Sequence, residues 1–362
     1  MPDAEIIPIG AKAAAGRGSR TSPSAAARAL APAPSKPKPR SRGVAAKAGA
    51  PRAGVVADET PDPKPVAAGD VTEAIADAAK EVFGESGWER RLAETLAFLR
   101  HRITGDYDVD EFGFDAEITE RFVLTALRPI AEKWFRIEVR GIENIPVEGG
   151  ALVVSNHSGA LPMDGLMTAL VLHDHAQRSL RILGADLVFT LPFIGELARK
   201  GGATLAGTED AERMLGRGDL VGVWPEGFKG IGKPFSERYK LQRFGRGGFV
   251  SAALRVKVPI IPCSVVGAEE IYPMVGNIPS LARLLGVPYI PITPFFPWLG
   301  LLGLVPLPSK WLIEFGEPIR TDSYGDGAAD DPMLVFNVTD QVRETIQQTL
   351  SSLLMQRRGV FS

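Results

Sequence analysis

The sequence predicts an α/β fold with a mostly parallel, mixed sheet flanked by helices, preceded by a helical segment and a disordered N-terminal tail. After residue 135, short apolar segments that end in glycine or polar residues alternate with segments of helical periodicity, as in consecutive βα units. The apolar segments are continuous, which is typical of strands buried on both faces of a parallel sheet. Before residue 67 the chain lacks the aromatic residues that could start a core.

Residues 1–66 form the predicted tail, which is rich in alanine, proline and basic residues. From Met1 to Val55 it carries ten Lys and Arg residues against Asp3 and Glu5, whereas the whole chain of 362 residues has a net charge of −2. The positive tail is compatible with attraction to an anionic membrane surface, and equally with a solvated linker that has no specific partner. The near-neutral balance of the whole chain predicts no nucleic-acid partner.

Residues 67–135 are predicted to be helical. Between residues 71 and 103, apolar side chains recur at spacings of three, four and six with charged residues between them. A second helix is predicted over residues 115–134, because Asp115 can cap its first turn. Pro129 is expected to bend or divide this helix.

Residues 136–325 are predicted to form the α/β domain, and the C-terminal region 326–362 is predicted to add one closing helix over residues 332–356. The expected strands cover residues 136–141, 150–156, 181–186, 203–207, 218–227 and 258–267. The expected helices of the domain include residues 165–172, 211–216 and 247–256. Ligand sites of such sheets collect where strands end and loops begin.

The segment 284–311 is the most apolar part of the chain, and its many prolines exclude one regular membrane-spanning helix. We expect it to face a membrane, with Phe295 and Phe296 entering the headgroup region and with Trp298 and Trp311 as interfacial anchors. An irregular buried cover over the core is the alternative. The first thirty residues lack the apolar run of a secretory signal, so export is not expected.

The single cysteine and the four histidines limit the chemistry that the chain can perform. Cys263 stands among apolar residues, which predicts a buried and unreactive thiol, and a lone cysteine excludes an intramolecular disulfide. His173 and His175 flank Asp174, but side chains two positions apart on a helix point to different faces, so no metal site is expected. Only His157 stands at the end of a predicted strand.

His157 and Asp164 are the candidate catalytic pair. A neutral imidazole can accept a proton from an alcohol, and a carboxylate can hold the other ring nitrogen protonated and stabilise the imidazolium that forms. A structural histidine is the alternative interpretation of these two residues taken alone.

Three sequence blocks in order resemble the glycerolipid acyltransferase family, which includes the lysophospholipid acyltransferases related to bacterial 1-acylglycerol-3-phosphate acyltransferase. The first block is Asn156-His157 followed by Asp164, the second is VGVWPEG, and the third is VPIIP. The resemblance covers residues 141–318, about half of the chain. A narrower similarity links NHSG, LPMDG and WPEGFKG to the subgroup that resembles plant phytyl-ester and diacylglycerol acyltransferases.

The resemblance implies an O-acyltransferase that moves a fatty acyl group to a lipid hydroxyl. His157 would be the general base and Asp164 would orient it. The donor would be acyl-CoA or acyl carrier protein, which are substrates, so no cofactor is implied. The partners would be the lipid acceptor, the acyl donor and a membrane surface, with the protein peripheral on the cytoplasmic face.

The resemblance also implies a set of substrate-binding residues. Glu226 and Gly227 match a block implicated in binding the acceptor, and Pro259 matches the block assigned to the acyl donor. Lys229 could supply a positive charge. The predicted substrate-binding residues are Asn156, Glu226, Gly227, Lys229 and Pro259.

Two departures from the family pattern affect the predicted site. Six residues separate His157 from Asp164, whereas the family has four. The two arginines expected to hold an acceptor phosphate are missing, since Gly207 and the segment 228–230 stand at their places. Other cations that could compensate are Arg199, Lys200, Lys233 and Arg243. This shortage favours a neutral or bulky alcohol, such as diacylglycerol, a long-chain alcohol or a glycolipid, or a lysophospholipid with a phosphodiester head, over lysophosphatidic acid.

Two other functions remain open from the sequence. A lipid esterase or thioesterase could use His157 to activate water. A catalytically inactive lipid-binding homologue could retain the scaffold, because the longer spacing between His157 and Asp164 could separate the pair.

Overall fold

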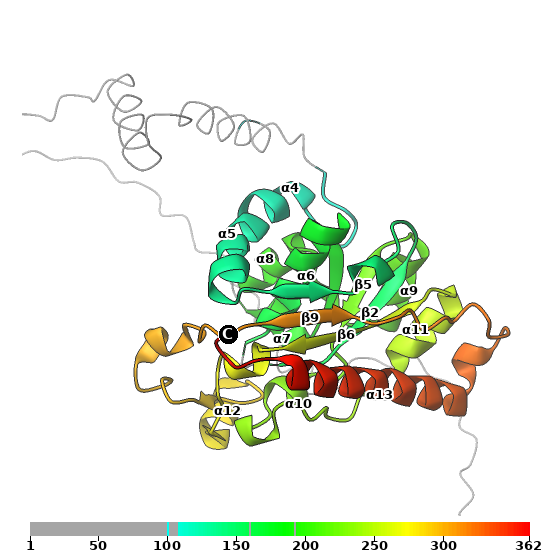
Figure 1. The fold of residues 1–362 in the computed structure, drawn as a ribbon. Coiled ribbons are helices and arrows are strands. Elements are labelled where there is room, and N and C mark those ends of the chain that lie inside the picture. Colours follow the sequence, from blue (N-terminus) through cyan, green and yellow to red (C-terminus); the bar gives the residue numbers. More distant parts are fainter. Residues whose placement is uncertain (1–99, 101–107, 159–160, 192) are drawn as a thin grey trace, which may run out of the picture. The chain divides into compact units, whose positions relative to one another are not determined.

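The computed structural model describes residues 100, 108–158, 161–191 and 193–362 (Figure 1). The tail predicted over residues 1–66 lies outside the described residues. So does the helix predicted between residues 71 and 103, apart from Arg100. The description below therefore concerns the α/β domain and the helices packed on it.

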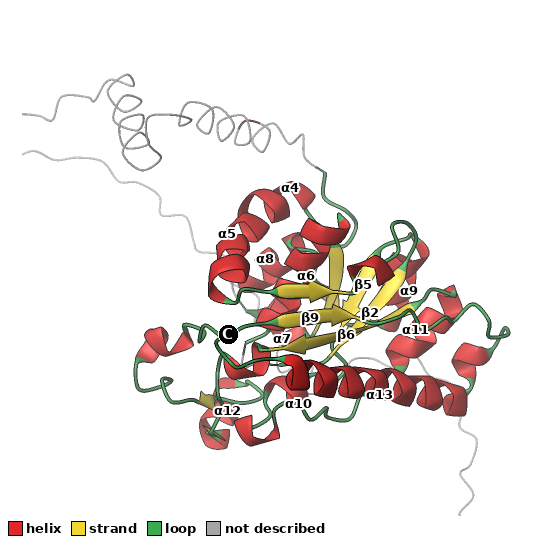
Figure 2. Cartoon of the chain, in the orientation of Figure 1, coloured by secondary structure: helices red, strands yellow, loops and turns green. Residues whose placement is uncertain are grey.

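Seven strands form one sheet in the order β1-β9-β6-β2-β5-β3-β4 (Figure 2). The strands are β1 (Glu138–Arg140), β2 (Ala151–Ser155), β3 (Leu180–Gly184), β4 (Thr204–Leu205), β5 (Leu220–Val223), β6 (Ile260–Val266) and β9 (Leu312–Phe315). The strands β6, β2, β5, β3 and β4 run parallel, whereas β9 is antiparallel to β6 and β1 is parallel to β9. The predicted fold class, a mostly parallel and mixed sheet, is confirmed.

One strand of this sheet was absent from the prediction. β9 lies between β1 and β6 and supplies the antiparallel pairing. It is four residues long and directly follows the proline-rich apolar segment, so no break in the sequence separates the two. A separate two-stranded sheet pairs β7 (Gly276–Asn277) with β8 (Pro291–Ile292).

Helices cover both faces of the seven-stranded sheet (Figure 1). The α-helices are α4 (Ala116–Ile118), α5 (Thr125–Pro129), α6 (Met163–Ala176), α7 (Asp186–Thr190), α8 (Ile194–Lys200), α9 (Thr208–Gly216), α10 (Phe228–Ile231), α11 (Gly248–Val256), α12 (Pro279–Leu285) and α13 (Pro332–Gln356). Leu152 and Val154 of β2 pack with α9, α11 and α13, whereas Ala151 and Val153 pack with α6. This alternation is what a strand buried on both faces requires. The short helices α7, α8, α10 and α12 were not predicted.

The helical run before the sheet occupies residues 116–134, as predicted. The side chain of Asp115 accepts a hydrogen bond from the Ile118 N–H and caps the run. α5 ends at Pro129, and the following turn is π-helical, η2 (Ile130–Trp134), as is η1 (Thr119–Leu124) before α5. Leu124 and Ala131 belong to the same core as the sheet. The run is therefore part of the α/β domain and not a separate unit.

The closing helix α13 has the predicted limits, Pro332–Gln356. The Asp331 side chain accepts hydrogen bonds from the N–H groups of Met333 and Leu334, and Pro332 occupies the first turn, where a missing N–H costs nothing. Its buried side chains recur every three or four residues and face the sheet: Val335, Val338, Val342, Ile346, Leu350 and Leu353.

The prediction for Trp311 as an interfacial anchor was wrong. The Trp311 side chain is fully buried and stacks on Phe135 with ring centroids 4.5 Å apart. Its indole N–H donates to the Ser309 hydroxyl. Trp311 thus connects β9 to the end of the helical run inside the core. Phe135 and Trp311 are far apart in the sequence, so the composition around Trp311 did not indicate this contact.

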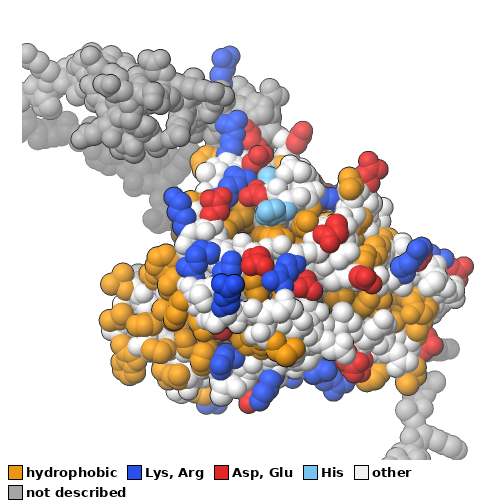
Figure 3. Space-filling view, viewed as in Figure 1, with side chains coloured by type: hydrophobic (Ala, Val, Ile, Leu, Met, Phe, Trp, Pro, Cys, Tyr) orange, Lys and Arg blue, Asp and Glu red, His pale blue; other side chains and the backbone are white. Residues whose placement is uncertain are grey.

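The rest of the proline-rich segment differs from Trp311. We call residues 279–305, from α12 to η6 (Gly300–Leu304) and the following Val305, the apolar lobe. Trp298 and Leu302 are each 73% exposed, and Figure 3 shows that hydrophobic side chains gather on this lobe, at the left of the view. Further exposed side chains of the lobe are Leu284, Phe295, Leu299 and Val305. In the described part of the chain, we find no helix that combines the length and the hydropathy needed to cross a membrane.

Candidate active site

The candidate site lies at the carboxyl ends of three neighbouring parallel strands, β6, β2 and β5. β2 is followed by Asn156 and His157, β5 by the segment 224–227, and β6 by the turn η5 (Ala268–Glu270). Carboxyl ends of parallel strands meet at one edge of a sheet, so residues more than 100 positions apart come together here. This is the place where the sequence predicted a site.

His157 and Asp164 are in direct contact. The Nδ1 atom of His157 lies 2.8 Å from Oδ2 of Asp164. The Asp164 side chain is fully buried, and the His157 side chain is 14% exposed. Because the carboxylate accepts the Nδ1–H, the proton is assigned to Nδ1, and Nε2 keeps the lone pair of a base.

Asp164 is held by two further hydrogen bonds. The Ser158 N–H donates to Oδ2 and the Gly165 N–H donates to Oδ1, each at 2.9 Å. Asp164 stands in the first turn of α6, where the helix dipole favours a negative charge. Asp164 thus reaches His157 despite the longer spacing in the sequence.

Asn156 is fully buried and bridges two strands. Its amide N–H₂ donates to the carbonyl of Val265 at 3.0 Å, and its carbonyl accepts the Val265 N–H at 2.8 Å. Both ends of the amide are therefore used by β6. This geometry suits a residue that positions His157, whereas the sequence predicted a contact with substrate.

The segment 224–227 forms a tight turn after β5. The Gly227 N–H donates to the Trp224 carbonyl, and Gly227 has φ +55 and ψ −144, a conformation that side chains disfavour. The turn carries the carboxylate of Glu226 back toward β2, where Oε1 accepts the His157 N–H at 2.8 Å. Glu226 Oε2 accepts the Gln242 N–H at 2.6 Å. The predicted pair Glu226 and Gly227 thus lies beside His157.

Gly230 of α10 packs against Glu226 and His157 without room for a side chain. A Cβ atom at Gly230 would lie 2.7 Å from Cβ of Glu226 and 2.9 Å from Cβ of His157. Real Cβ atoms do not approach that closely, so α10 can take this position only with glycine. The sequence analysis did not assign Gly230 to the site.

One aromatic side chain lies beside the pair. The Trp224 ring is 6.0 Å from the His157 ring, centroid to centroid. Burial raises the pKa of the Tyr289 hydroxyl, and the charge of Asp164 adds to this increase. A mostly apolar open groove of about 570 Å³ is lined by residues 185–187, by Phe228 and by residues 286–288, which directly precede Tyr289.

The cationic candidates differ in surroundings. Lys229 and Arg243 are exposed, and the structure gives neither side chain an ion pair with any described residue. Lys233 is buried and lies 3.5 Å from Glu226 Oε2. The other two have partners elsewhere, because Arg199 lies over the Phe189 ring and Lys200 pairs with Glu196.

Pro259 does not lie with the other predicted site residues. Its carbonyl accepts the Leu152 N–H at the amino end of β2, whereas His157 follows the carboxyl end. The strand length separates the two positions.

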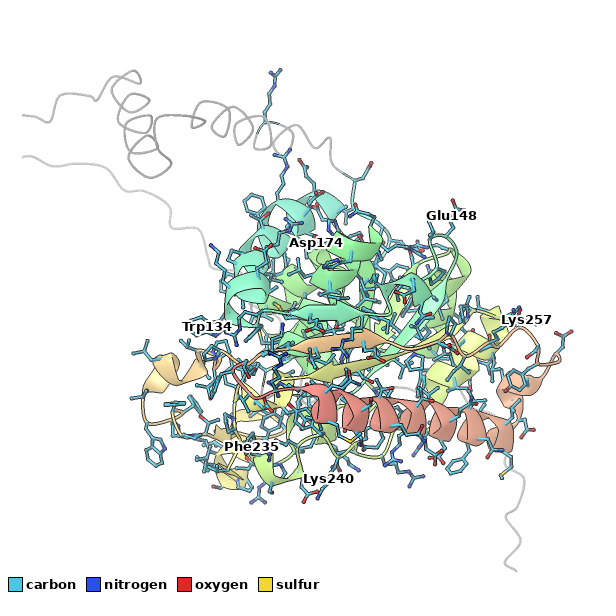
Figure 4. All side chains as sticks on the ribbon, viewed as in Figure 1. Trp134, Glu148, Asp174, Phe235, Lys240 and Lys257 are labelled. Atoms are coloured by element: carbon cyan, nitrogen blue, oxygen red, sulfur yellow. The ribbon has the colours of Figure 1, made fainter. Side chains whose placement is uncertain are left out.

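Asp174 and Cys263 make contacts that serve the fold. Asp174, labelled in Figure 4, accepts two hydrogen bonds from the guanidinium of Arg128 and contacts His173. Cys263 is fully buried in β6, and burial raises the pKa of its thiol to about 12, which keeps it protonated and unreactive. The predicted buried thiol is confirmed.

Several residues of the site escaped the sequence analysis: Trp224, Gly230, Gln242 and Glu269. Trp224 and Gly230 belong to WPEGFKG, so the motif itself was the available signal. Gln242 and Glu269 reach the site through the fold alone.

A family profile and several proteins are similar to this chain in sequence. The sequence profile of the acyltransferase family matches residues 136–266, which include His157, Asp164 and Glu226. An uncharacterized protein of Mycobacterium tuberculosis is 61% identical over 272 residues, covering 75% of this chain and 76% of that protein. A human protein described as a "DGAT1/2-independent enzyme synthesizing storage lipids" is 30% identical over 193 residues, covering 53% of this chain and 56% of that protein.

A solved structure is also similar. The crystal structure of the 1-acyl-sn-glycerophosphate acyltransferase from Thermotoga maritima aligns with a TM-score of 0.43 and 20% sequence identity. The alignment covers 66% of this chain and 83% of that chain.

Proposed function

Because the chain belongs to the acyltransferase family, we propose that it moves a fatty acyl group from acyl-CoA or acyl carrier protein to the hydroxyl group of a lipid. His157 is the general base in this proposal, and Asp164 is its partner. The observation that carries the proposal is the 2.8 Å contact between Nδ1 of His157 and Oδ2 of Asp164. The contact counts against a catalytically inactive homologue, because the longer spacing does not separate the pair.

The reaction follows from the free Nε2 atom of His157. Nε2 takes the proton of the acceptor hydroxyl while the hydroxyl oxygen attacks the thioester carbonyl carbon. The tetrahedral intermediate expels the thiolate, which takes the proton from the imidazolium. Asp164 stabilises the imidazolium between the two proton transfers. The products are an ester and a free thiol, and no acyl-enzyme is formed.

The acceptor that we propose is a neutral lipid alcohol, with diacylglycerol as the first candidate. The arginines expected for an acceptor phosphate are missing from their places, and Lys233 is already paired with Glu226 and Glu269. The description of the human relative as an enzyme synthesizing storage lipids supports a neutral product. The open groove beside Phe228 offers mostly apolar walls for a lipid chain.

We further propose that the protein works as a peripheral protein on the cytoplasmic face of a membrane. The exposed Trp298 and Leu302 of the apolar lobe support contact with an apolar surface. Lipid acceptors reside in membranes, so an enzyme that docks there meets its substrate at high local concentration.

The experiment is an acyl-transfer assay with palmitoyl-CoA against dioleoylglycerol, hexadecanol, lysophosphatidylcholine and lysophosphatidic acid, read by mass spectrometry. We expect an ester of a neutral alcohol to form and free CoA to appear only with an acceptor. A parallel reaction without acceptor tests the esterase or thioesterase alternative. Free palmitate formed at the same rate with and without acceptor would replace the transferase by a hydrolase.

A further inference from the structure

A buried charge cluster lies directly behind His157. It consists of Glu226, Lys233 and Glu269, whose side chains are 0%, 3% and 4% exposed. The Nζ atom of Lys233 lies 3.5 Å from Glu226 Oε2 and 3.1 Å from Glu269 Oε1. Neither Lys233 nor Glu269 has a role in the transfer reaction described above.

Glu226 uses both carboxylate oxygens on backbone groups. Oε1 accepts the N–H of His157 and Oε2 accepts the N–H of Gln242. The Glu226 side chain is fully buried, so a substrate hydroxyl has no open approach to either oxygen. Glu226 therefore acts on the backbone of the base itself.

Lys233 compensates the buried charge of Glu226. A carboxylate removed from water is costly unless a cation and hydrogen bonds replace the lost hydration. Among the described residues, no other Lys or Arg forms an ion pair with Glu226. The third acceptor near Nζ is the carbonyl of Lys240, at 3.1 Å. Nζ thus donates hydrogen bonds to the Lys240 carbonyl and to Glu269 Oε1, and it faces Glu226 Oε2 as an ion pair.

Glu269 completes the cluster from the turn after β6. Burial raises the pKa of Glu269 to about 7, although Lys233 lowers it. Near neutral pH, Glu269 therefore carries only part of a negative charge. Lys233 thus contacts two carboxyl groups, a hydrogen-bonded one on Glu269 at 3.1 Å and an ion-paired one on Glu226 at 3.5 Å.

The loop between α10 and α11 supplies the remaining contacts. Phe235 and Lys240, labelled in Figure 4, both belong to it. Gln347 of α13 fixes the loop, since its side chain donates to the Tyr239 carbonyl and accepts the Leu241 N–H. The acceptor at Lys240 and the donor at Gln242 are thereby held in place around Lys233 and Glu226.

From this geometry we infer that Lys233 is a positioning residue for the acyl transfer, acting through the Glu226 carboxylate on the backbone N–H of His157. The inference deepens the proposed function and rests on it for the kinetic test. Gly230 packs closely against both Glu226 and His157. We therefore expect a small shift of Glu226 to displace His157 as well.

The first test replaces Lys233 by methionine, which keeps the length of the side chain without its charge. With palmitoyl-CoA and dioleoylglycerol in mixed micelles, we expect kcat to fall roughly 100-fold, as for a misplaced catalytic group. The KM for palmitoyl-CoA should stay within about threefold, because the Lys233 side chain is only 3% exposed and offers no surface for the donor. A loss of kcat/KM that comes from a higher KM, with kcat unchanged, would overturn the inference.

Arg357→Met is the matched control. Arg357 forms a comparably buried ion pair with Glu270, with side chains 5% and 6% exposed, and its other bonds go to the carbonyls of Lys310 and Val360. We expect this variant to lose stability and to keep kcat within about threefold. A loss of kcat equal to that of Lys233→Met would mean that any broken buried pair impairs the enzyme.

A double-mutant cycle with Glu226→Gln separates positioning from general damage. If Lys233 acts through Glu226, adding Lys233→Met to Glu226→Gln should lower kcat less than about threefold further. Additive losses would overturn the inference. Should Lys233→Met fail to fold, Lys233→Met combined with Glu269→Gln removes both the ammonium group and the carboxyl group hydrogen-bonded to it, and the same loss of kcat is expected.

Amide hydrogen exchange decides the inference without an activity assay. We expect the peptide that contains His157 to exchange at least about tenfold faster in Lys233→Met than in Arg357→Met, because its N–H loses a fixed acceptor. Equal exchange in the two variants would overturn the inference. An inactive wild-type protein with this difference intact would instead reject the proposed function alone.

Discussion

The carboxyl edge of the sheet and the apolar lobe differ in which side chains they bury. At the edge, charged groups such as Asp164, Glu226 and Lys233 are buried and paired. On the lobe, large apolar groups such as Trp298 and Leu302 are exposed to solvent. Among the described residues, the charged groups of the edge have their partners, as preorganised chemistry requires, whereas no apolar group covers these side chains of the lobe. Each prediction below tests one side of this comparison.

The largest effect is expected for Asp164→Asn. The amide cannot stabilise the imidazolium as a carboxylate does, so kcat should fall about 10³-fold with the fold retained. Asp174→Asn is the matched control, since Asp174 lies on the same helix and contacts His173. Steady-state kinetics of the two variants measure the effect, and similar kcat values for both would refute the pairing.

Glu269 tests the cost of burying charge at the edge. Its folded pKa, about 7, lies above the usual 4.5, so the folded state favours the protonated form. The stability that protonation adds is therefore complete below pH 4.5 and is lost as the pH rises through 7, by roughly 3 kcal/mol in total. Urea denaturation at pH 5 and pH 8 should show Glu269→Gln gaining stability relative to the wild type at the higher pH. A difference that does not vary with pH would contradict this.

Gly230→Ala tests the tight packing of the edge. The added methyl group would meet Glu226 and His157 at less than contact distance, so we expect kcat to fall about 10²-fold. Gly216→Ala is the control, because the nearest atom to its Cβ, in Val256, lies 3.9 Å away. Wild-type kinetics of Gly230→Ala would show that α10 can move away from Glu226 and His157 without loss of activity.

Trp298→Ala tests the lobe and has the smallest expected effect. Removing this exposed indole should weaken binding to vesicles of equal parts phosphatidylcholine and phosphatidylglycerol about tenfold, with thermal stability unchanged. Phe336→Ala, which removes a 56% exposed aromatic from α13, should leave binding unchanged. Co-sedimentation provides the measurement, and equal binding of the two variants would mean that the lobe does not contact the membrane.

Local signals in the sequence were sufficient for the elements that carry the site. The continuous apolar run of β2 expresses a local preference, and β2 and α13 lie where predicted. β5 ends at Val223, before the end predicted at residue 227. β9 was not predicted, because a four-residue strand that directly follows an apolar segment forms no local pattern of its own.

Contacts between distant residues account for most of what the sequence could not predict. Trp298 and Trp311 stand in similar apolar, proline-rich sequence. In the fold, Trp298 is exposed, whereas Trp311 is buried and packs on Phe135. Lys233 and Glu269 are 36 positions apart and meet through the fold. The return of Asp164 to His157 depends on the path of a loop, which spacing alone does not determine.

The most direct measurement of the central claim compares the wild type with His157→Ala, using palmitoyl-CoA and a lipid alcohol with ¹⁸O in its hydroxyl group. If His157 activates that hydroxyl for direct attack, the wild-type ester retains ¹⁸O, and His157→Ala forms it about 10⁴-fold more slowly with an unchanged circular dichroism spectrum. Undiminished ester formation by His157→Ala would contradict the account.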